Sequence, residues 1–254
     1  MGDEKKMRLD RFFSSQGLLS RKEASKWIRT GRIMVNGRAV KDPGAYVAPG
    51  EDTIQKDGET LFYQKYRYLM MNKPEGVVSA TRDGGGQTVL DLLPEAFRRP
   101  GLFPAGRLDK NATGLLIITD DGEYAHRMLS PRQHVYKQYQ VCLDRPVTTA
   151  DRERFREGIV YQGISYASGL LRQGPDNTGE VWIREGKYHQ VKRMFEACGN
   201  HVNALKRIRI GGLHLDGDLA PAAVREMSRE EADLVFEEND TDGFQREIRQ
   251  GREN

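Results

Sequence analysis

The sequence of 254 residues is long enough for two domains of ordinary size, and its hydrophobic content of 37% indicates packed cores rather than disorder. No apolar run approaches the roughly eighteen residues of a membrane span. Residues 1–6 lack the apolar core of a signal peptide, so we expect a cytoplasmic protein. Cys142 and Cys198 lack the spacing of a disulfide framework or zinc site, which predicts two core thiols.

The net charge of +3 conceals an uneven distribution along the chain. Residues 228–254 hold four Arg against nine Asp or Glu, and the rest of the chain holds 36 basic against 28 acidic residues. A basic body favours a polyanionic partner, although many cytosolic proteins are mildly basic. Residues 237–254 have the composition of an acidic, disordered tail.

Residues 7–60 have the pattern of a small module made of two helices and a hairpin. Apolar residues recur at helical spacing over 9–13, and Ser20 with Glu23 predicts a capping box at the start of a second helix. The dipeptide Asn36-Gly37 separates two short apolar runs. Because both of its residues tolerate positive φ, it predicts a type I′ hairpin.

Cations lie between the apolar positions of this module. They are Arg8, Arg11, Arg21, Lys22, Lys26, Arg29, Arg32 and Arg38. Three of them crowd the start of the second helix, where positive charge opposes the helix dipole, so local helix stability does not explain them. A solvated basic face and a phosphate-contacting surface both fit this arrangement.

The order of a helix, an S-R-K-E-A helix and a V-N-G hairpin resembles the S4 RNA-binding domain. This resemblance covers roughly residues 7–55. It implies that the module contacts RNA, and the implied contacts are Arg8, Arg21, Lys22, Lys26, Arg29 and Arg32.

A second domain, residues 68–236, is expected after a polar linker at 61–67. Its first strand is predicted at Tyr68–Met71, and Thr88 is expected to cap a helix that ends near Phe97. The glycine-rich run at 83–86 is not followed by G-K-[ST], which excludes a nucleotide-binding P-loop. Further elements are predicted as a helix at 123–129 and strands at 137–143 and 206–210.

The stretch 106–119 leads a charged loop directly into a strand that we expect to be buried on both faces. An unpaired carboxylate beside such a core costs several kcal/mol, so Asp109 at the strand entrance needs a role. One interpretation is a loop carboxylate that caps amides or pairs with Arg107. The other is a nucleophile or acid–base group held rigidly in place.

The segment 185–195 precedes Gly199-Asn200 and predicts a helix with one face in the core. Its first turn carries Lys192 and Arg193, where cations are unfavourable, so we expect a nearby anion. A phosphate and a carboxylate such as Asp109 are both possible partners. His189 has no second His or Cys at the spacing of a metal site, which argues against a metal.

Two predicted strands carry further candidate residues. Tyr139 shares one face of strand 137–143 with other apolar residues, so it is either a core aromatic or a wall of the cleft that contains Asp109. Strand 206–210 alternates cations with apolar residues, which predicts one buried face and one basic face for a polyanion.

Four ordered motifs resemble the pseudouridine synthases of the RsuA type. They are N-K-P-E-G at 72–76, G-R-L-D at 106–109, K-Q-Y at 137–139 and E-G-K-Y-H-Q-V-K-R-M at 185–194. The resemblance implies an α+β protein, in which an N-terminal S4 domain precedes a catalytic domain built on a largely antiparallel mixed sheet flanked by helices. It also implies a ribosomal RNA isomerase that needs no cofactor and no metal.

The resemblance implies a role for each site residue. Asp109 is the expected catalytic aspartate, Tyr139 the ring that stacks on uracil, and Lys192 the cation paired with the aspartate. Arg107 is expected to hold the base out of the RNA stack, and Lys73 and Arg193 are further expected RNA contacts.

The runs at 119–132 and 199–212 look most like the enzyme that acts on small-subunit (16S) rRNA. They imply uridine 516 as the target, in naked RNA or in a ribosomal assembly intermediate, and we expect a monomer. Three alternatives stay open. They are a synthase acting on 23S rRNA, a non-catalytic S4 protein of ribosome assembly, and an S4-containing methyltransferase, although the glycines at 84–86 lack the context of a cofactor loop.

Overall fold

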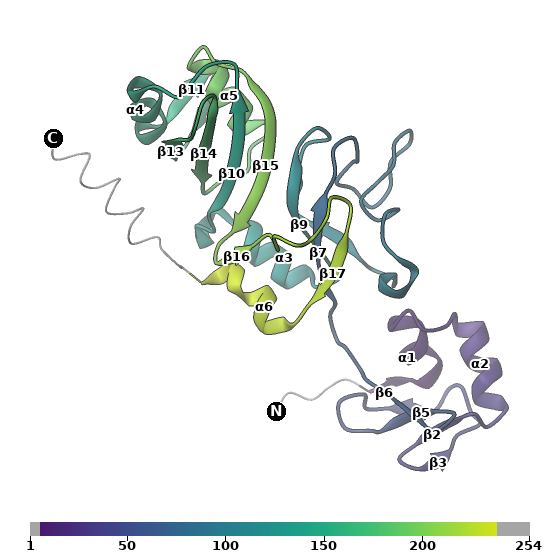
Figure 1. The fold of residues 1–254 in the computed structure, drawn as a ribbon. Coiled ribbons are helices and arrows are strands. Elements are labelled where there is room, and N and C mark those ends of the chain that lie inside the picture. The colour runs from purple at the N-terminus through teal and green to yellow at the C-terminus, as the bar shows by residue number, and fades with distance from the viewer. Residues whose placement is uncertain (1–5, 238–254) are drawn as a thin grey trace. The chain divides into compact units, whose positions relative to one another are not determined.

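The computed structural model describes residues 6–237, which divide into two compact units (Figure 1). The first unit contains the residues up to Arg67 together with Leu93–Leu102, and the second contains Tyr68–Leu92 and the residues from Phe103 onward. The sequence predicts a disordered acidic tail at 237–254, and its residues from 238 on lie outside the described part. No helix within residues 6–237 is long and apolar enough to cross a bilayer.

The first unit packs two helices against short strands. Its elements are β1 (Met7–Arg8), α1 (Leu9–Ser15), α2 (Arg21–Arg29), β2 (Ile33–Val35), β3 (Arg38–Ala39), β4 (Tyr46–Val47), β5 (Ile54–Lys56) and β6 (Glu59–Leu61). Four strands form a sheet in the order β3-β2-β5-β6, and β1 pairs with β4. The predicted capping box of Ser20 and Glu23 is confirmed, as is the hairpin turn with Asn36 at φ 52° and Gly37 at φ 72°.

The first unit also takes in one loop from the segment that the sequence assigned to the second domain. The side chain of Arg99 donates hydrogen bonds to the backbone carbonyls of Gln64 (2.9 Å) and Lys65 (3.0 Å). These bonds tie 93–102 to the chain that leads out of the S4 module.

Within residues 68–237, the second unit is built on a nine-stranded mixed sheet in the order β13-β14-β10-β15-β9-β7-β17, with β16 on β15 and β8 on β9. Its strands are β7 (Tyr68–Lys73), β8 (Phe103–Ala105), β9 (Thr113–Thr119), β10 (Lys137–Leu143), β13 (Leu170–Gln173), β14 (Thr178–Ile183), β15 (Val202–Ile210), β16 (Leu213–His214) and β17 (Val224–Met227). A separate hairpin joins β11 (Ile159–Tyr161) to β12 (Ile164–Tyr166). The α+β prediction is therefore confirmed.

In the part of this unit that the structure describes, four α-helices accompany the sheet, namely α3 (Gly122–Leu129), α4 (Thr149–Glu157), α5 (Gln190–Ala197) and α6 (Arg229–Asp233). In Figure 1, α4 and α5 lie beside the group formed by β13, β14, β10 and β15. The predicted helix at 123–129 is confirmed, with Asp121 as its N-cap.

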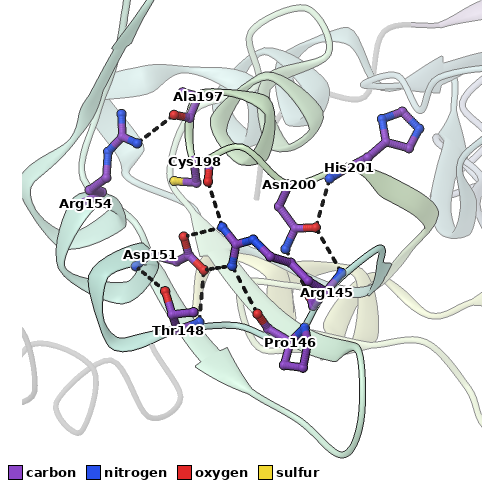
Figure 2. A network of polar contacts seen from close by, with 9 residues as sticks. All are labelled: Arg145, Pro146, Thr148, Asp151, Arg154, Ala197, Cys198, Asn200 and His201. Atoms are coloured by element: carbon purple, nitrogen blue, oxygen red, sulfur yellow. Dashed lines mark hydrogen bonds and ion pairs between the residues drawn. The ribbon is translucent and has the colours of Figure 1, made fainter.

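A polar network, shown in Figure 2, holds the C-terminal end of α5 against the N-terminal end of α4. The guanidinium of Arg145 donates to the carboxylate of Asp151 (2.7 and 3.0 Å) and to the backbone carbonyl of Cys198 (2.7 Å). Asn200 accepts from the backbone N–H groups of Arg145 (3.3 Å) and His201 (2.9 Å). Because the last carbonyls of a helix have no partner inside it, this network satisfies an end of α5 that would otherwise fray.

The buried strand predicted after the G-R-L-D loop is confirmed as β9, in which Leu115–Ile118 are completely buried. β9 pairs in parallel with β15 over only two positions, one of which joins Gly114 to Arg207. Gly114 has a φ of +99°, and a Cβ atom there would lie 2.2 Å from the carbonyl oxygen of Arg207. The glycine is therefore required where the two strands meet.

Three of the sequence predictions about the fold are wrong. Residues 88–97 form turns and a short 3-10 helix at Glu95–Phe97 instead of an α-helix, since Pro94 removes a donor and disfavours the helical conformation of the preceding residue. Cys142 is exposed and Cys198 half-buried, so neither is a core thiol.

The third wrong prediction is the basic face of the strand at 206–210. A register shift in the pairing of β15 with β10 falls between the partners Arg209 and Arg207. The bulge breaks the alternation of faces, so Arg207 turns inward and is only 4% exposed. Lys206 stays on the surface.

Candidate active site

The loop that carries Asp109 is held by hydrogen bonds on both sides of the carboxylate. The hydroxyl of Ser79 donates to the carbonyl of Leu108 (2.9 Å) and accepts from its N–H (3.2 Å). The N–H of Ala112 donates to the carbonyl of Asp109 (3.0 Å). These bonds leave the loop backbone little freedom, so the carboxylate is presented from a fixed base.

Lys73 lies beneath this loop and is completely buried. Its ammonium donates to the backbone carbonyls of Pro74 (2.9 Å), Lys110 (3.3 Å) and Ala112 (2.8 Å). Burial lowers the pKa of Lys73 to about 8, partly offset by the nearby charges of Asp109 and Glu75. The expectation that Lys73 contacts RNA is therefore corrected, because its three donors hold the loop from inside.

The N-terminal turn of α5 faces the Asp109 carboxylate. Lys192 Nζ lies 3.7 Å from Oδ2 of Asp109, and His189 Nε2 lies 3.7 Å from Oδ1. The side chains of Lys192 and Asp109 are 15% and 24% exposed, and Lys192 also donates to the side-chain oxygen of Asn111. Of the two anions considered for the first turn of α5, the structure places the carboxylate there.

His189 reaches this position through an unusual backbone conformation. It is the N-cap of α5 with φ 52° and ψ 30°, in the left-handed region that residues with a side chain seldom occupy. The sequence predicted only that His189 is not a metal ligand, and its position beside Asp109 was not predicted. No local signal in the sequence predicts positive φ at this residue.

A cavity of about 220 Å³ opens beside Asp109. It is lined by Arg107, Leu108, Asp109, Ala112, Tyr139, Ile183, Gly186, Lys187, Tyr188, His189, Gln190, Val191 and Leu205. This volume is smaller than the roughly 300–1,000 Å³ of pockets for drug-sized ligands, so it suits a single planar ring. Within residues 6–237, no group of His, Cys, Asp and Glu side chains is arranged to hold a metal ion.

Tyr139 combines the two roles that the sequence left open. It is only 7% exposed, as a core residue would be, and its ring also lines the cavity that contains Asp109. Arg107 is exposed and lines the same cavity, whereas Arg193 lies outside the lining and donates to the hydroxyl of Tyr166 at 3.5 Å. The structure therefore gathers Asp109, Tyr139 and Arg107 in one cavity, with Lys192 beside the carboxylate.

Arg207 contacts the backbone on both sides of the loop that carries Asp109, which the sequence did not predict. Its Nε donates to the carbonyl of Leu115 (2.8 Å), and its Nη1 lies 3.5 Å from the carbonyl of Arg107. The alternating pattern of the strand assigned Arg207 to the solvent, so a pattern of residues could not reveal this buried position.

The basic side chains predicted to contact RNA are on the surface of the first unit. They are Arg8, Arg21, Lys22, Lys26, Arg29 and Arg32, all exposed. Arg8 and Arg21 share the carboxylate of Asp10, and Arg32 pairs with Asp57. The carboxylates orient three of these guanidinium groups without burying them.

Family models match both units. The S4 domain matches residues 7–52, and the RNA pseudouridylate synthase model matches residues 67–197. The chain is 42% identical over 228 residues to the ribosomal small subunit pseudouridine synthase A of Escherichia coli K12, covering 89% of this chain and 98% of the relative. It is 41% identical over 236 residues to the uncharacterized RNA pseudouridine synthase YtzG of Bacillus subtilis, covering 91% and 99%.

A solved structure described as the crystal structure of pseudouridylate synthase matches with a TM-score of 0.62 and 35% identity, over 90% of this chain and 99% of the other. These matches, together with an S4 unit and a mixed-sheet unit that holds a small cavity, identify an RNA-modifying enzyme. The chain belongs to the RNA pseudouridylate synthase family and is of the RsuA type, with an N-terminal S4 domain.

Proposed function

We propose that this enzyme converts one uridine of small-subunit rRNA to pseudouridine, with uridine 516 of the 16S molecule as the target and Asp109 as the catalytic residue. The observation that carries the proposal is the Asp109 carboxylate, which shares a base-sized cavity with the ring of Tyr139 and lies 3.7 Å from the Lys192 ammonium. The small-subunit target is supported by relatives named as small-subunit enzymes, which this chain matches along almost its whole length.

The reaction is an isomerisation, so the side chains around the cavity can carry it out without a further reactant. The bond between N1 of uracil and C1′ of ribose breaks, the base turns, and C5 bonds to C1′ while C5 loses a proton and N1 gains one. No electron acceptor and no additional group takes part, and so no cofactor is needed. Three chemical paths use a carboxylate at the wall of the base cavity. In these paths Asp109 attacks C1′, attacks C6, or assists formation of a glycal.

Each side chain around the cavity has a task in this proposal. Tyr139 offers a ring face on which uracil stacks while the base is detached, and confinement keeps the detached base close enough to rebond. Lys192 compensates the Asp109 charge, because a carboxylate that has lost part of its hydration is stabilised by a nearby cation. Arg107 is exposed at the same cavity. In this proposal its side chain fills the gap that the flipped base leaves in the RNA stack.

Flipping the nucleotide costs a few kcal/mol, which contacts to the RNA backbone offset. The exposed cations of the S4 unit have the chemistry for such contacts, since Lys and Arg side chains bind phosphates without needing a fixed sequence. We propose that they hold rRNA or a ribosomal assembly intermediate, with the protein acting as a monomer.

The test is substitution of the carboxylate. Asp109→Asn keeps the size and shape of the side chain, so we expect it to abolish pseudouridine formation while RNA affinity stays within about twofold of wild type. Unchanged turnover would rule out Asp109. Pseudouridine mapping of rRNA from cells that lack the protein tests the target: a missing modification in large-subunit rRNA would contradict the small-subunit assignment, and an intact pattern would favour a non-catalytic assembly role.

A further inference from the structure

Two aromatic rings form an exposed stack at the cavity. The rings of Tyr188 and His189 lie 3.8 Å apart between centroids with an interplanar angle of 16°. Both residues line the cavity that contains Asp109 and Tyr139. Tyr188 is 67% exposed, whereas Tyr139 is 7% exposed, so the two tyrosines at this cavity occupy opposite environments.

The segment that carries this stack is fixed from its buried side. Gln190 is 3% exposed, accepts from the N–H of Lys187 (3.0 Å) and donates to the carboxylate of Glu185 (3.0 Å). The same carboxylate accepts from the N–H of Ala167 (2.7 Å). These bonds anchor the segment 185–190 on both sides of Tyr188, and the stack with His189 supports its ring.

Core packing does not account for the exposed ring. A tyrosine exposed to this extent gains little from burial, so the core does not explain its position at the cavity. Cations lie close by: the guanidinium carbon of Arg193 is 5.3 Å from the centroid of the Tyr188 ring, and Lys187 precedes it in the chain. Aromatic rings interleaved with cations are the combination that binds single-stranded nucleic acid.

We infer that Tyr188, backed by His189, stacks on the nucleobase next to the target uridine. This inference rests on the proposed function, because it takes the target base to occupy the cavity beside Asp109. When that base enters the cavity, its neighbour in the strand is the group nearest to the rim where Tyr188 lies. Every nucleobase has a π-face, so the contact orders the strand whatever the identity of the neighbour.

The contact would hold the RNA strand in its distorted form. A nucleotide turned out of the stack leaves its neighbour without one stacking partner. The Tyr188 ring replaces that partner. Because the segment that carries the ring is anchored, the ring is already in place before RNA binds. Tyr188 is therefore a substrate-positioning residue, distinct from the groups that face the reacting atoms.

The test combines variants with RNAs that lack a single base. Rates of pseudouridine formation under kcat/KM conditions are measured on an rRNA fragment that contains the target uridine, and on fragments abasic at its 5′ or its 3′ neighbour. We expect Tyr188→Ala to lower kcat/KM about tenfold on the intact fragment and no more than about twofold on one of the abasic fragments. Tyr188→Phe keeps the ring and should recover most of the loss.

Tyr46→Ala serves as the matched control, since Tyr46 is 69% exposed but belongs to the first unit. Its effect, whatever its size, should be equal on the intact and abasic fragments. An equal loss for Tyr188→Ala on all three RNAs, or no loss on the intact one, would overturn the inference. Dissociation constants of the three RNAs, measured with and without Tyr188→Ala in the Asp109→Asn background, test the same coupling between the Tyr188 ring and the neighbouring base without turnover. A wild-type protein that binds with this coupling but forms no pseudouridine would thus contradict the proposed function alone.

Discussion

The ammonium of Lys192 in the first turn of α5 lies 3.7 Å from the carboxylate of Asp109 at the entrance to β9. Either group alone would be unfavourable where it stands, because a cation opposes the dipole at a helix N-terminus and a carboxylate beside a buried strand loses solvation. The pair resolves both conflicts at once. Their contact also joins the two segments that carry the most distinctive motifs of the sequence.

We expect Lys192→Met to lower kcat by about a hundredfold or more, because Asp109 would lose the cation that stabilises its charge. RNA affinity should change by less than about threefold, since Lys192 is 15% exposed and absent from the cavity lining. Single-turnover rates at saturating RNA measure the effect. Lys192→Arg, which keeps the charge, is the control and should recover part of the rate. A variant changed in KM alone would place Lys192 among the RNA contacts instead.

The meeting of β9 with β15 makes Gly114→Ala strongly destabilising. A Cβ atom would lie 2.2 Å from the Arg207 carbonyl oxygen, and the φ of +99° is unfavourable for any side chain. We expect the free energy of unfolding to fall by about 3 kcal/mol or more, measured by urea denaturation. Gly84→Ala is the matched control, because nothing lies within 4 Å of a Cβ atom there. Equal stability of the two variants would show that the strands can separate at this point.

The Arg145 network in Figure 2 predicts that substitution of Arg145 lowers the stability of the fold. Arg145→Met removes the donor to the carboxylate of Asp151, which is buried, and to the carbonyl of Cys198, so both acceptors lose a charged partner. We expect the unfolding free energy to fall by about 2–4 kcal/mol. Arg154→Met is the control, since the Arg154 side chain is exposed and donates to the Ala197 carbonyl, which is not a charged acceptor. A loss of similar size in both variants would contradict a special role for the Arg145 network.

The sequence predictions that the structure confirms depend on residues close together in the chain. Asn36-Gly37 sets its own backbone angles, and Ser20 with Glu23 closes a capping box within four residues, so neither depends on distant chain. The five residues after Gly114 were apolar enough to require a buried strand. Asp109 was singled out because its charge conflicts with that strand.

The predictions that failed depend on contacts made by the folded chain. Arg207 turns inward at a β-bulge, and the strand partner that produces the bulge is far away in the sequence. Lys73 belongs to a motif that suggested RNA contact, yet its acceptors are carbonyls of a loop that only folding brings near. The position of His189 beside Asp109 likewise follows from a left-handed backbone conformation, which the neighbouring residues in the sequence do not predict.

The buried Lys137 predicts a stability that rises with pH. It is 7% exposed and donates to the carbonyl of Val135 (3.0 Å), and burial, with the charge of Arg207, lowers its pKa from 10.5 to about 8. Between pH 8 and 10.5 the unfolded chain therefore binds more protons at this residue than the folded chain does. Since stability rises with pH wherever the unfolded state binds more protons, Lys137 should contribute an increase across this window.

Lys137→Met tests this contribution, because it removes the titrating group and keeps an apolar side chain of similar length. We expect its unfolding free energy to exceed that of wild type below pH 8, by up to about 3 kcal/mol, and the difference to shrink as the pH approaches 10.5. Urea unfolding at several pH values measures the difference. Lys110→Met, at an exposed lysine, should show a constant difference from wild type. A constant difference for Lys137→Met as well would mean that the Lys137 ammonium keeps its proton in the fold at alkaline pH.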